Sequence, residues 1–290
     1  MRLFTLKELL AQTRSNGFAV GAFNFNNYED AQAIVNAAIS QNAPVILMAS
    51  SGAIKYMGLH QLYHMVLGIA EVSTVPICLH LDHGTDVDLI KKAIDIGFPS
   101  VMIDASRHAY ADNIAITSEI SHYADEHNCS VEAELGKVGG KEEDIVVADN
   151  ADVLTDPEDV IPFIQQTHID ALAVAIGTVH GFYKKEPNLD FARLEKIAGI
   201  TDCPLVLHGG SGLTDDEFKK CISLGIQKVN VGTELKSGFS NTLRQMSEKL
   251  SSDEFDPRCF MKPVKDAVTA IVEHKLQVFG SDGKAQLYIE

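Results

Sequence analysis

Tryptophan is absent from this sequence, aromatic residues are few, and no apolar run is long. None of the 290 residues is Trp, and Phe, Trp and Tyr together make up 7% of the chain. No apolar run approaches the roughly 20 residues that a membrane-spanning helix needs. The N-terminal segment MRLFTLKELLAQTRSNG is charged throughout and lacks the apolar stretch that marks a signal peptide. We therefore expect no membrane span and no secretory leader.

Cysteine is also scarce, and its distribution excludes two kinds of site. The five cysteines are odd in number, widely spaced and form no CxxC pair. This pattern argues against a disulfide framework and against a zinc site built from cysteine. Reduced thiols are typical of the cytoplasm, so we predict a cytoplasmic protein. The cysteines are Cys78, Cys129, Cys203, Cys221 and Cys259.

Basic residues are too few to balance the acidic ones. Lys and Arg total 24 against 40 Asp and Glu, which gives a formal net charge of -16. So acidic a chain repels nucleic-acid backbones and anionic lipid, and we expect no nucleic-acid or membrane partner. An anionic small substrate would need a locally built anion site. With 46% apolar residues, the chain can bury a large core.

Eight short β-rich segments alternate with segments of helical pattern. Their near-continuous apolar character is typical of parallel strands that are buried on both faces. Eight such units in about 230 residues predict an α/β fold, a (β/α)8 TIM barrel, formed by a single domain over 1–290 with an extra helix at 257–275. A six-stranded doubly wound sheet is the alternative. The predicted strands are 18–25, 44–50, 76–81, 99–105, 129–135, 171–177, 204–209 and 227–232.

Three helical segments carry recognisable caps. Asn27 is a predicted N-cap ahead of a segment with acidic residues in its first turn. Thr85 is the predicted N-cap of a helix that ends on Gly97. Thr214, followed three residues later by Glu217, predicts a capping box.

One long insertion follows the fifth predicted strand. Residues 136–157 are rich in glycine and charge, and they lie where a TIM barrel keeps its active site. Long insertions of this kind are often functional. We predict a mobile active-site loop at about 136–157, a lid that is poorly ordered over 139–152 without ligand; a plain surface loop is the alternative.

Polar side chains gather at the C-terminal ends of six successive predicted strands, which is where TIM barrels keep their active sites. Three of them are histidines that would converge on one point. Three protein ligands and one open position are typical of catalytic zinc, so we predict a metal site. His80 lies one step deeper on the same strand face as Asp82, and we expect it to support the site. The polar residues are Asp82, His83, Asp104, Glu132, Glu134, His180, His208, Asn230 and Thr233.

Glycine clusters at the last three strand ends form a second signal. The segments GTVHG, HGGSG and NVGT follow predicted strands six, seven and eight. TIM barrels often bind phosphate between the loops after strands seven and eight. Glycine lets backbone N–H groups approach an anion, and Ser211 and Thr233 add hydroxyl donors. We therefore predict a phosphate site that includes Gly181, Gly209, Gly210 and Gly232.

Together these motifs resemble a known family. HLDHGT, EAELG with its following GG, E and D, AIGTVHGFYK, PLVLHGGSG and VNVGTELK are similar in type and order to the class II, zinc-dependent ketose-bisphosphate aldolases. That family includes the fructose- and tagatose-1,6-bisphosphate aldolases. The resemblance runs from about Leu6 to the C-terminal GSDGKA. It implies a TIM barrel that reversibly cleaves a ketose 1,6-bisphosphate to dihydroxyacetone phosphate and glyceraldehyde 3-phosphate.

The resemblance also implies roles for individual residues. His83, His180 and His208 match the zinc ligands, and Asp82 matches the acid/base that handles the proton of the substrate's C4 hydroxyl. Glu142, in the insertion, matches the glutamate that moves the proton at the carbon destined for bond formation. Further candidate cofactors are a second divalent ion and a monovalent cation. Asp104 and Glu134 match carboxylates that hold a second divalent ion or orient the first. Glu132 matches another family carboxylate near the metal.

Substrate and subunit contacts are implied in the same way. Gly181, Gly209, Ser211, Asn230 and Thr233 match the cradle for dihydroxyacetone phosphate, and Lys184 matches a further contributor. Arg258, in DPRCF, matches an arginine that reaches the distal phosphate, often across a subunit contact. The implied assembly is a homodimer or homotetramer, and some tagatose-type systems add a companion subunit.

Several alternatives stay open beside this interpretation. The sequence ASSGAIKYMG departs from the SEG or SNG that often follows strand two in fructose-type members, so the choice between fructose and tagatose bisphosphate, or a related phosphorylated ketose, is not made. A Schiff-base aldolase would need a lysine where strand six ends in GTVH. An amidohydrolase would need HxH on strand one, where AFNFN stands. A non-catalytic barrel subunit is the remaining alternative.

Overall fold

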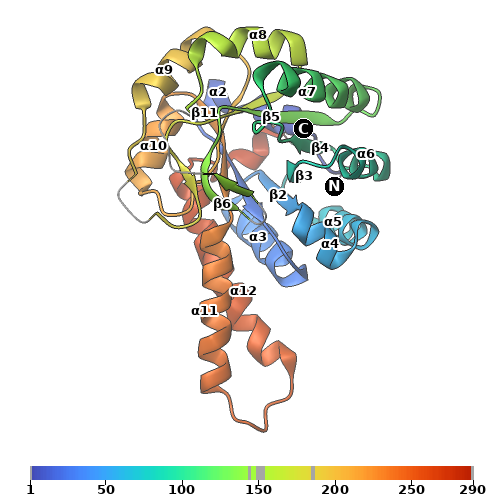
Figure 1. Cartoon of the computed structure of the whole chain (residues 1–290). Helices are drawn as coiled ribbons and strands as arrows, with labels where there is room; N and C mark the ends of the chain where they lie inside the picture. The colour runs from blue at the N-terminus through green and yellow to red at the C-terminus, as the bar shows by residue number, and fades with distance from the viewer. Residues whose placement is uncertain (1, 143–144, 148–153, 184–186, 289–290) are drawn as a thin grey trace.

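Eight parallel strands close into a barrel, and helices surround it (Figure 1). The computed structural model describes residues 2–142, 145–147, 154–183 and 187–288, and of 141–142 and 145–147 it describes the backbone alone. The prediction of a (β/α)8 TIM barrel is confirmed. In their order around the barrel the strands are β1 (Val20–Asn24), β11 (Ile226–Val231), β10 (Leu205–Leu207), β8 (Ala171–Val174), β5 (Ser130–Leu135), β4 (Ser100–Ile103), β3 (Ile77–Gly84) and β2 (Val45–Ser50).

A helix follows each barrel strand, and two further helices precede the first. The predicted C-terminal helix is confirmed as α12. The helices are α1 (Leu6–Leu10), α2 (Thr13–Asn16), α3 (Tyr28–Gln41), α4 (Ser51–Met57), α5 (Leu59–Val72), α6 (Val87–Ile96), α7 (Tyr110–Asp125), α8 (Pro157–Thr167), α9 (Phe191–Ile200), α10 (Asp215–Ser223), α11 (Thr233–Lys249), α12 (Pro257–Val278) and the short 3-10 helix η2 (Lys284–Tyr288). None of the helices described is both long enough and apolar enough to cross a bilayer.

The strands sort their side chains into two environments. On β3, Ile77, Leu79 and Leu81 belong to the large apolar cluster between barrel and helices, whereas Cys78 belongs to a second cluster. That second cluster contains alternate residues of several other strands together with Leu6, Leu9 and Leu10 of α1. Because strand side chains alternate between faces, these residues face the barrel interior. Further along the strands the same register positions carry polar residues, and these build the site.

The predicted helix caps are confirmed except for one. Asn27 caps α3, and Thr214 and Glu217 form the capping box of α10. The N-cap of α6 is Asp86 and not Thr85, because the Asp86 carboxylate accepts the N–H groups of the second and third helical residues. Gly97 ends α6 in the left-handed conformation, as expected.

The insertion after β5 contains strands of its own, which sequence patterns did not indicate. Strands β6 (Gly139–Glu142) and β7 (Ile145–Val147) form an antiparallel hairpin, and β6 pairs in parallel with β9 (Val179–His180). Gly140 fits this pairing because a Cβ there would lie 2.4 Å from the carbonyl oxygen of His180. Most of the predicted lid segment, 139–152, lies outside the residues whose side chains are described.

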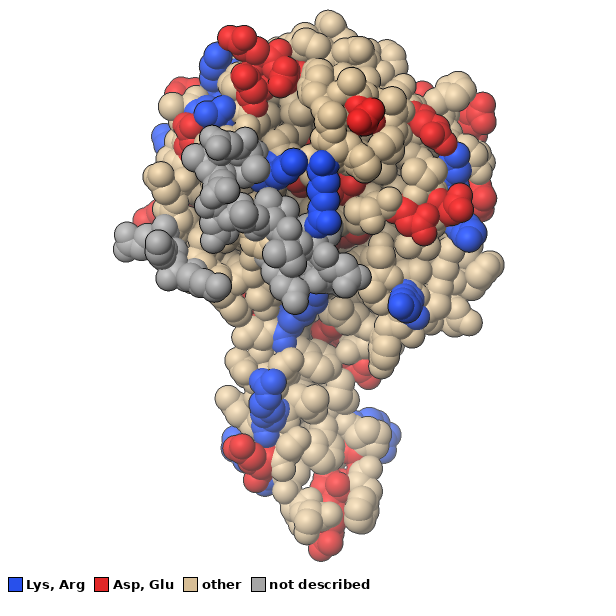
Figure 2. All heavy atoms as spheres, viewed as in Figure 1, with Lys and Arg blue, Asp and Glu red and all other residues tan. Residues whose placement is uncertain are grey.

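The last two long helices form a hairpin that projects from the barrel. In Figure 1, α11 leaves the barrel and α12 returns to it, and Figure 2 shows their outer ends as a stalk carrying both acidic and basic side chains. α12 also packs along α3. Phe255, in the turn between α11 and α12, is 84% exposed, so an aromatic ring faces solvent at the tip of the stalk.

Candidate metal and substrate site

A β-bulge at the end of β3 brings two consecutive side chains to the barrel mouth. Asp82 and His83 would face opposite sides of a regular strand. The pairing of β3 with β4 shifts register between Leu81 and Gly84, and His83 has a positive φ of 47°, which non-glycine residues rarely adopt. The bulge therefore lets adjacent residues serve one site, and its backbone strain is typical of a functional position.

The three predicted ligand histidines meet at the mouth. His83 is the second-last residue of β3, His180 lies on β9, and His208 directly follows β10. The centroid of the His83 ring lies 4.6 Å from that of His208 and 5.0 Å from that of His180, and all three side chains are buried. One ring nitrogen from each lies within 4.8 Å of the others. The structure thus brings together side chains that are far apart in the chain.

The hydrogen bonds of two of these rings indicate which nitrogen faces the centre. Nδ1 of His83 lies 3.1 Å from Oδ2 of Asp104, and Nε2 of His208 lies 2.8 Å from Oε1 of Glu132. The remaining nitrogens, His83 Nε2 and His208 Nδ1, lie 2.8 Å from each other. Tetrahedral zinc would hold two such nitrogens roughly 3.3 Å apart. A carboxylate on the far nitrogen of each ring is the usual support for metal-binding imidazoles, so the residues fit a divalent cation.

Two predicted carboxylates form a second group beside His83. One ligand atom from each of Asp104, Glu134 and His83 lies within 4.8 Å of the others. Burial disfavours the charge of Asp104, but His83 and Ser106 outweigh it, and the pKa of Asp104 is held well below its usual range. Burial and the Asp104 carboxylate raise the pKa of Glu134 to about 8. This pair therefore also fits a cation, or serves to orient His83.

The raised pKa of Glu134 predicts a pH-dependent stability of the metal-free protein. Between about pH 4.5 and 8 the folded state keeps a proton on Glu134 that the unfolded chain releases, so the free energy of unfolding falls as pH rises. Glu134→Gln removes this contribution. We expect wild type to lose stability relative to this variant by up to about 1.4 kcal/mol per pH unit across the window. Urea unfolding in chelator measures the difference; parallel pH curves would contradict the prediction.

Asp82 lies beside the histidines and is held by two amides. Asn24 Nδ2 donates to its Oδ2 at 2.8 Å, and Asn230 Nδ2 donates to its Oδ1 at 3.4 Å. Asn24 ends β1, and sequence analysis did not select it. The signal was available, since Asn24 is also a polar residue at the C-terminal end of a strand. Both amides orient the carboxylate that the resemblance identifies as the acid/base.

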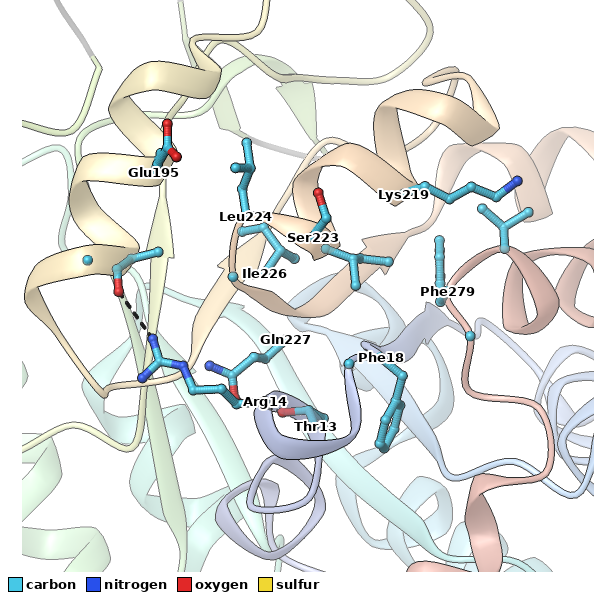
Figure 3. Close-up of a pocket in the computed structure, with 17 residues that line it drawn as sticks. Thr13, Arg14, Phe18, Glu195, Lys219, Ser223, Leu224, Ile226, Gln227 and Phe279 are labelled. Carbon is cyan, nitrogen blue, oxygen red and sulfur yellow. Dashed lines mark hydrogen bonds between the residues drawn. The ribbon is translucent and has the colours of Figure 1, made fainter.

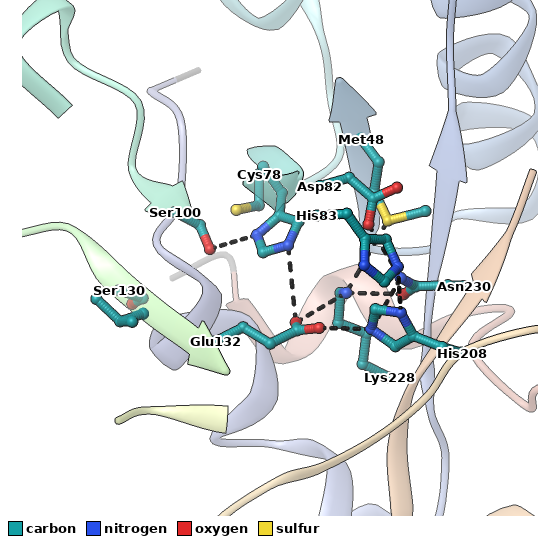
Figure 4. Close-up of polar contacts among 12 residues, drawn as sticks. Met48, Cys78, Asp82, His83, Ser100, Ser130, Glu132, His208, Lys228 and Asn230 are labelled. Atoms are coloured by element: carbon teal, nitrogen blue, oxygen red, sulfur yellow. Dashed lines mark hydrogen bonds and ion pairs between the residues drawn. The ribbon is translucent and has the colours of Figure 1, made fainter. Parts of the chain in front are cut away.

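Below the mouth, a buried polar cluster fills the barrel interior (Figure 4). Glu132 accepts from His208 through Oε1, and its Oε2 lies 2.9 Å from Nζ of Lys228. His80 Nδ1 lies 2.7 Å from Ser100 Oγ, and its Nε2 lies 3.7 Å from Glu132. Burial opposes ionisation of Glu132, but Lys228 and His208 outweigh it and hold its pKa far below the usual range. The structure places Glu132 behind His208 and not at the predicted metal centre.

The predicted phosphate residues line one recess beside the histidines. Gly209 has a positive φ of 66°, and a Cβ there would lie 2.7 Å from the carbonyl oxygen of Val179. The recess contains the N-terminus of α11, whose N-cap Gly232 has no side chain to cap it, and a helix N-terminus attracts anions. Such a recess can bind a phosphate. Its lining residues are Asn24, His180, Gly181, Gly209, Gly210, Ser211, Asn230, Gly232 and Thr233.

Of the remaining predicted site residues, the structure places one away from this group and does not describe the other two. The side chain of Glu142 and the whole of Lys184 lie outside the described residues. Arg258 is in the first turn of α12, and this helix begins at the outer end of the stalk (Figure 1). The guanidinium of Arg258 pairs with Asp256 at 2.7 Å. The side chain of Arg258 is 88% exposed. Arg258 is therefore remote from the barrel mouth of its own chain.

A larger cavity of about 560 Å³ lies elsewhere and has no comparable chemistry (Figure 3). It is bounded by the segments that precede β1 and β11 and by the end of α9. Arg14 at its wall already donates to the carbonyl oxygens of Ala198 and Thr201 and to Asp202. Among the described residues, the His and carboxylate groups that could hold a metal are all at the other site.

Sequence comparison shows relatives along the whole chain. The family model described as fructose-bisphosphate aldolase class-II matches residues 4–284. The fructose-bisphosphate aldolase of Geobacillus stearothermophilus is 46% identical over 288 residues, covering 98% of this chain and 99% of the relative. That of Staphylococcus epidermidis strain RP62A is 43% identical over 289 residues, covering 99% and 100%.

Comparison of structures gives the same result. The crystal structure of the YdjI aldolase from Escherichia coli K12 superposes with a TM-score of 0.87 at 32% sequence identity, covering 98% of this chain and 99% of that one. The matches in sequence and in structure both extend through the barrel and the C-terminal helices. This chain is therefore a member of the class II fructose-bisphosphate aldolase family, the metal-dependent aldolases.

Proposed function

We propose that this protein reversibly cleaves fructose 1,6-bisphosphate into dihydroxyacetone phosphate and glyceraldehyde 3-phosphate. The observation that carries the proposal is the meeting of three buried imidazoles, Asp82 and an anion-binding recess at one barrel mouth. Cleavage of C3–C4 needs a group that takes the C4 hydroxyl proton, a means to stabilise the resulting enediolate, and a hold on the phosphates. The site has a candidate for each.

We propose Zn²⁺ as the cation at His83, His180 and His208. When bound, it supplies Lewis-acid stabilisation of the negative charge that develops on the substrate oxygens. The three buried imidazoles would hold it in a setting where electrostatic interactions are stronger than in water. Asp104 and Glu134 are proposed to hold a second divalent ion or to orient His83.

Asp82 is proposed to remove the C4 hydroxyl proton as the C3–C4 bond breaks. The donors Asn24 and Asn230 orient its carboxylate at the mouth, where a general base must lie within hydrogen-bonding reach of the proton that it takes. In the synthetic direction the same group returns that proton to the new hydroxyl. The small recess around Ser211 and Thr233 is proposed to bind the phosphate of the dihydroxyacetone half.

Glu142 is proposed to protonate the enediolate, and the insertion that carries it to act as a lid. The pairing of β6 with β9 supports this role, because the backbone that ends at Glu142 runs beside the strand that carries His180. A closed lid would exclude water from a reactive intermediate. The protonation would convert the enediolate to dihydroxyacetone phosphate.

A second copy of the chain is proposed to supply Arg258 to the distal phosphate, as in a homodimer or homotetramer. The position of Arg258 at the end of the stalk supports this, since it is remote from its own site. Arg258→Ala is expected to raise KM by about 10–100-fold, as expected for loss of a charged hydrogen bond to phosphate. Steady-state kinetics at low substrate measures the change.

Mixing subunits distinguishes the two possible origins of Arg258. A dimer of one Arg258→Ala chain and one Asp82→Asn chain would contain one intact site if the arginine acts across the interface. Refolding equal amounts together should therefore restore about a quarter of wild-type activity by random pairing. The control mixture, Asp82→Asn with His208→Ala, should restore none, because both lesions affect a chain's own site. No recovery in the first mixture would mean that Arg258 acts elsewhere.

The test of the function is a coupled assay of metal-loaded protein. We expect production of dihydroxyacetone phosphate and glyceraldehyde 3-phosphate from fructose 1,6-bisphosphate, with tagatose 1,6-bisphosphate as the comparison substrate. Faster cleavage of tagatose bisphosphate would reassign the substrate within the same reaction. No cleavage of either sugar, with metal bound, would favour a related phosphorylated ketose or a barrel that depends on a companion subunit.

A cytoplasmic location is part of the same proposal. All five cysteines are free in the structure, and Cys78, Cys129 and Cys221 are buried. Free buried thiols are typical of a reducing compartment. The proposed substrate and both products are phosphorylated sugars, which supports the assignment.

A further inference from the structure

Lys228 is a fully buried lysine inside the barrel, where a charged side chain is costly. It lies on β11 with its side chain 0% exposed, and its ammonium contacts Glu132 Oε2 at 2.9 Å and Asn230 Oδ1 at 2.7 Å. Glu132 is equally buried. Buried ion pairs are often no more stabilising than apolar side chains of similar volume. Stability alone is therefore a weak explanation for this pair.

The first consequence of Lys228 concerns His208. A carboxylate paired with an ammonium only accepts hydrogen bonds, so Glu132 Oε1 requires a hydrogen on Nε2 of His208 at 2.8 Å. A neutral imidazole then has its lone pair on Nδ1. That nitrogen faces His83 Nε2 at 2.8 Å, on the side of the predicted metal centre. The charge of Lys228 thus selects the tautomer of His208 that can bind a cation.

The second consequence concerns Asn230. An ammonium has only donors, so the amide oxygen of Asn230 must face Lys228 and its NH2 group must face away. The NH2 group then lies between Asp82 and His208, with Nδ2 3.4 Å from Asp82 Oδ1 and 3.2 Å from His208 Nε2. Because Nε2 of His208 donates to Glu132 at 2.8 Å, the acceptor for the amide hydrogens is the Asp82 carboxylate. Lys228 and the Asp82 carboxylate therefore both favour the same orientation of the amide, and without Lys228 one of these two constraints is lost. In Figure 4, dashed lines connect Lys228 both to Glu132 and to Asn230.

We propose that Lys228 is a positioning residue that sets His208 for the metal through Glu132 and Asp82 for proton transfer through Asn230. The inference rests on the proposed metal-dependent cleavage and deepens it, since it explains how His208 and Asp82 are oriented by a buried side chain below the barrel mouth. Lys228 is neither among the described groups that could hold a metal nor among the residues that line the phosphate recess. Its effect reaches the site through the ion pair with Glu132 and the hydrogen bond to Asn230.

The test compares Lys228→Met with wild type, using Co²⁺ as the metal probe. Methionine has similar length and no charge. We expect the variant to bind Co²⁺ 10–100-fold more weakly, as is usual when support of a metal-binding imidazole is lost. The absorption bands of tetrahedral Co²⁺ should weaken or shift, and kcat for fructose 1,6-bisphosphate should fall at least tenfold, with a smaller change in KM. Lys91→Met is the matched control, because Lys91 pairs with Glu119 at the surface.

A second variant covers the case in which Lys228→Met leaves Glu132 unpaired and fails to fold. Lys228→Met with Glu132→Gln carries no unpaired charge, but the Gln amide can also donate to Nε2 and so permits the wrong tautomer. We expect this protein to fold and still to bind Co²⁺ at least tenfold more weakly than wild type. If a folded variant matches wild type in Co²⁺ affinity, Co²⁺ spectrum and kcat, Lys228 has no positioning role. If wild type itself neither binds Co²⁺ nor cleaves the sugar, the proposed function fails instead.

Discussion

Replacing His208 with alanine is expected to abolish metal binding and sugar cleavage together. The side chain is fully buried, and Nδ1 of His208 faces His83 at the centre of the cluster. Two imidazoles remain in the variant, which is fewer than the three protein ligands of a typical catalytic zinc site. Loss of the Lewis acid removes several kcal/mol of transition-state stabilisation, which corresponds to at least about a 10³-fold loss in kcat/KM.

Two measurements on His208→Ala should agree. Metal content after dialysis, determined by elemental analysis, should fall from near one equivalent to a small fraction, and the coupled assay should show no cleavage above background. The substitution removes a buried imidazole and one hydrogen-bond partner of Glu132, so it could also affect folding. Circular dichroism of the variant is the control for this effect. Lys91→Met serves again as a surface control. Wild-type turnover by a folded His208→Ala protein would remove this histidine from the ligand set.

Asp82→Asn should separate chemistry from metal binding. Asp82 lies beside the cluster, but the described groups that could hold a metal do not include it. The variant should therefore keep its metal ion and lose kcat by about 10²–10⁴-fold, the usual contribution of a positioned acid/base. An amide cannot take the C4 hydroxyl proton. Elemental analysis and kinetics on the same preparation test both halves of the expectation.

Asn24→Ala provides a graded comparison for Asp82→Asn. It leaves the carboxylate in place and removes the donor at 2.8 Å, so its effect on kcat should be about tenfold and far smaller than that of Asp82→Asn. If Asp82→Asn loses its metal ion as well as its activity, Asp82 is a structural or ligand residue. Equal effects of the two variants would mean that carboxylate orientation matters more than its chemistry.

The fold followed from sequence because its signals are local. Alternating apolar segments and helical segments with caps such as Asn27 and Thr214 predict a parallel α/β barrel, and each barrel strand lies within a few residues of its predicted range. The convergence of His83, His180 and His208 then follows from the fold, since all parallel strands end at the same face. The phosphate recess follows by the same argument, because its glycines come from three neighbouring strand ends.

Other features depend on long-range pairing that no local pattern reveals. The bulge that turns His83 comes from the register of β3 against β4, and the strand at Gly139–Glu142 exists because it pairs with β9 across the chain. Lys228 in QKVNVG resembles an exposed lysine until the strand register places it inside the barrel. It was detectable in principle, since it lies two residues before Asn230 and so shares its face. The pairing of Lys228 with Glu132 could not be inferred without knowing the order of the strands in the barrel.

The stalk constrains how this protein can vary in length. α11 begins at the phosphate recess and runs for 17 residues, about 25 Å, to the tip near Arg258. Each residue added to a helix rotates everything beyond it by about 100°. A single-residue insertion in α11 would therefore turn the tip of the stalk to another side. The tip would keep its direction only if both helices were lengthened or shortened together by nearly a whole number of turns. Homologues with longer or shorter stalks should differ by such steps, or should engage a differently arranged neighbour.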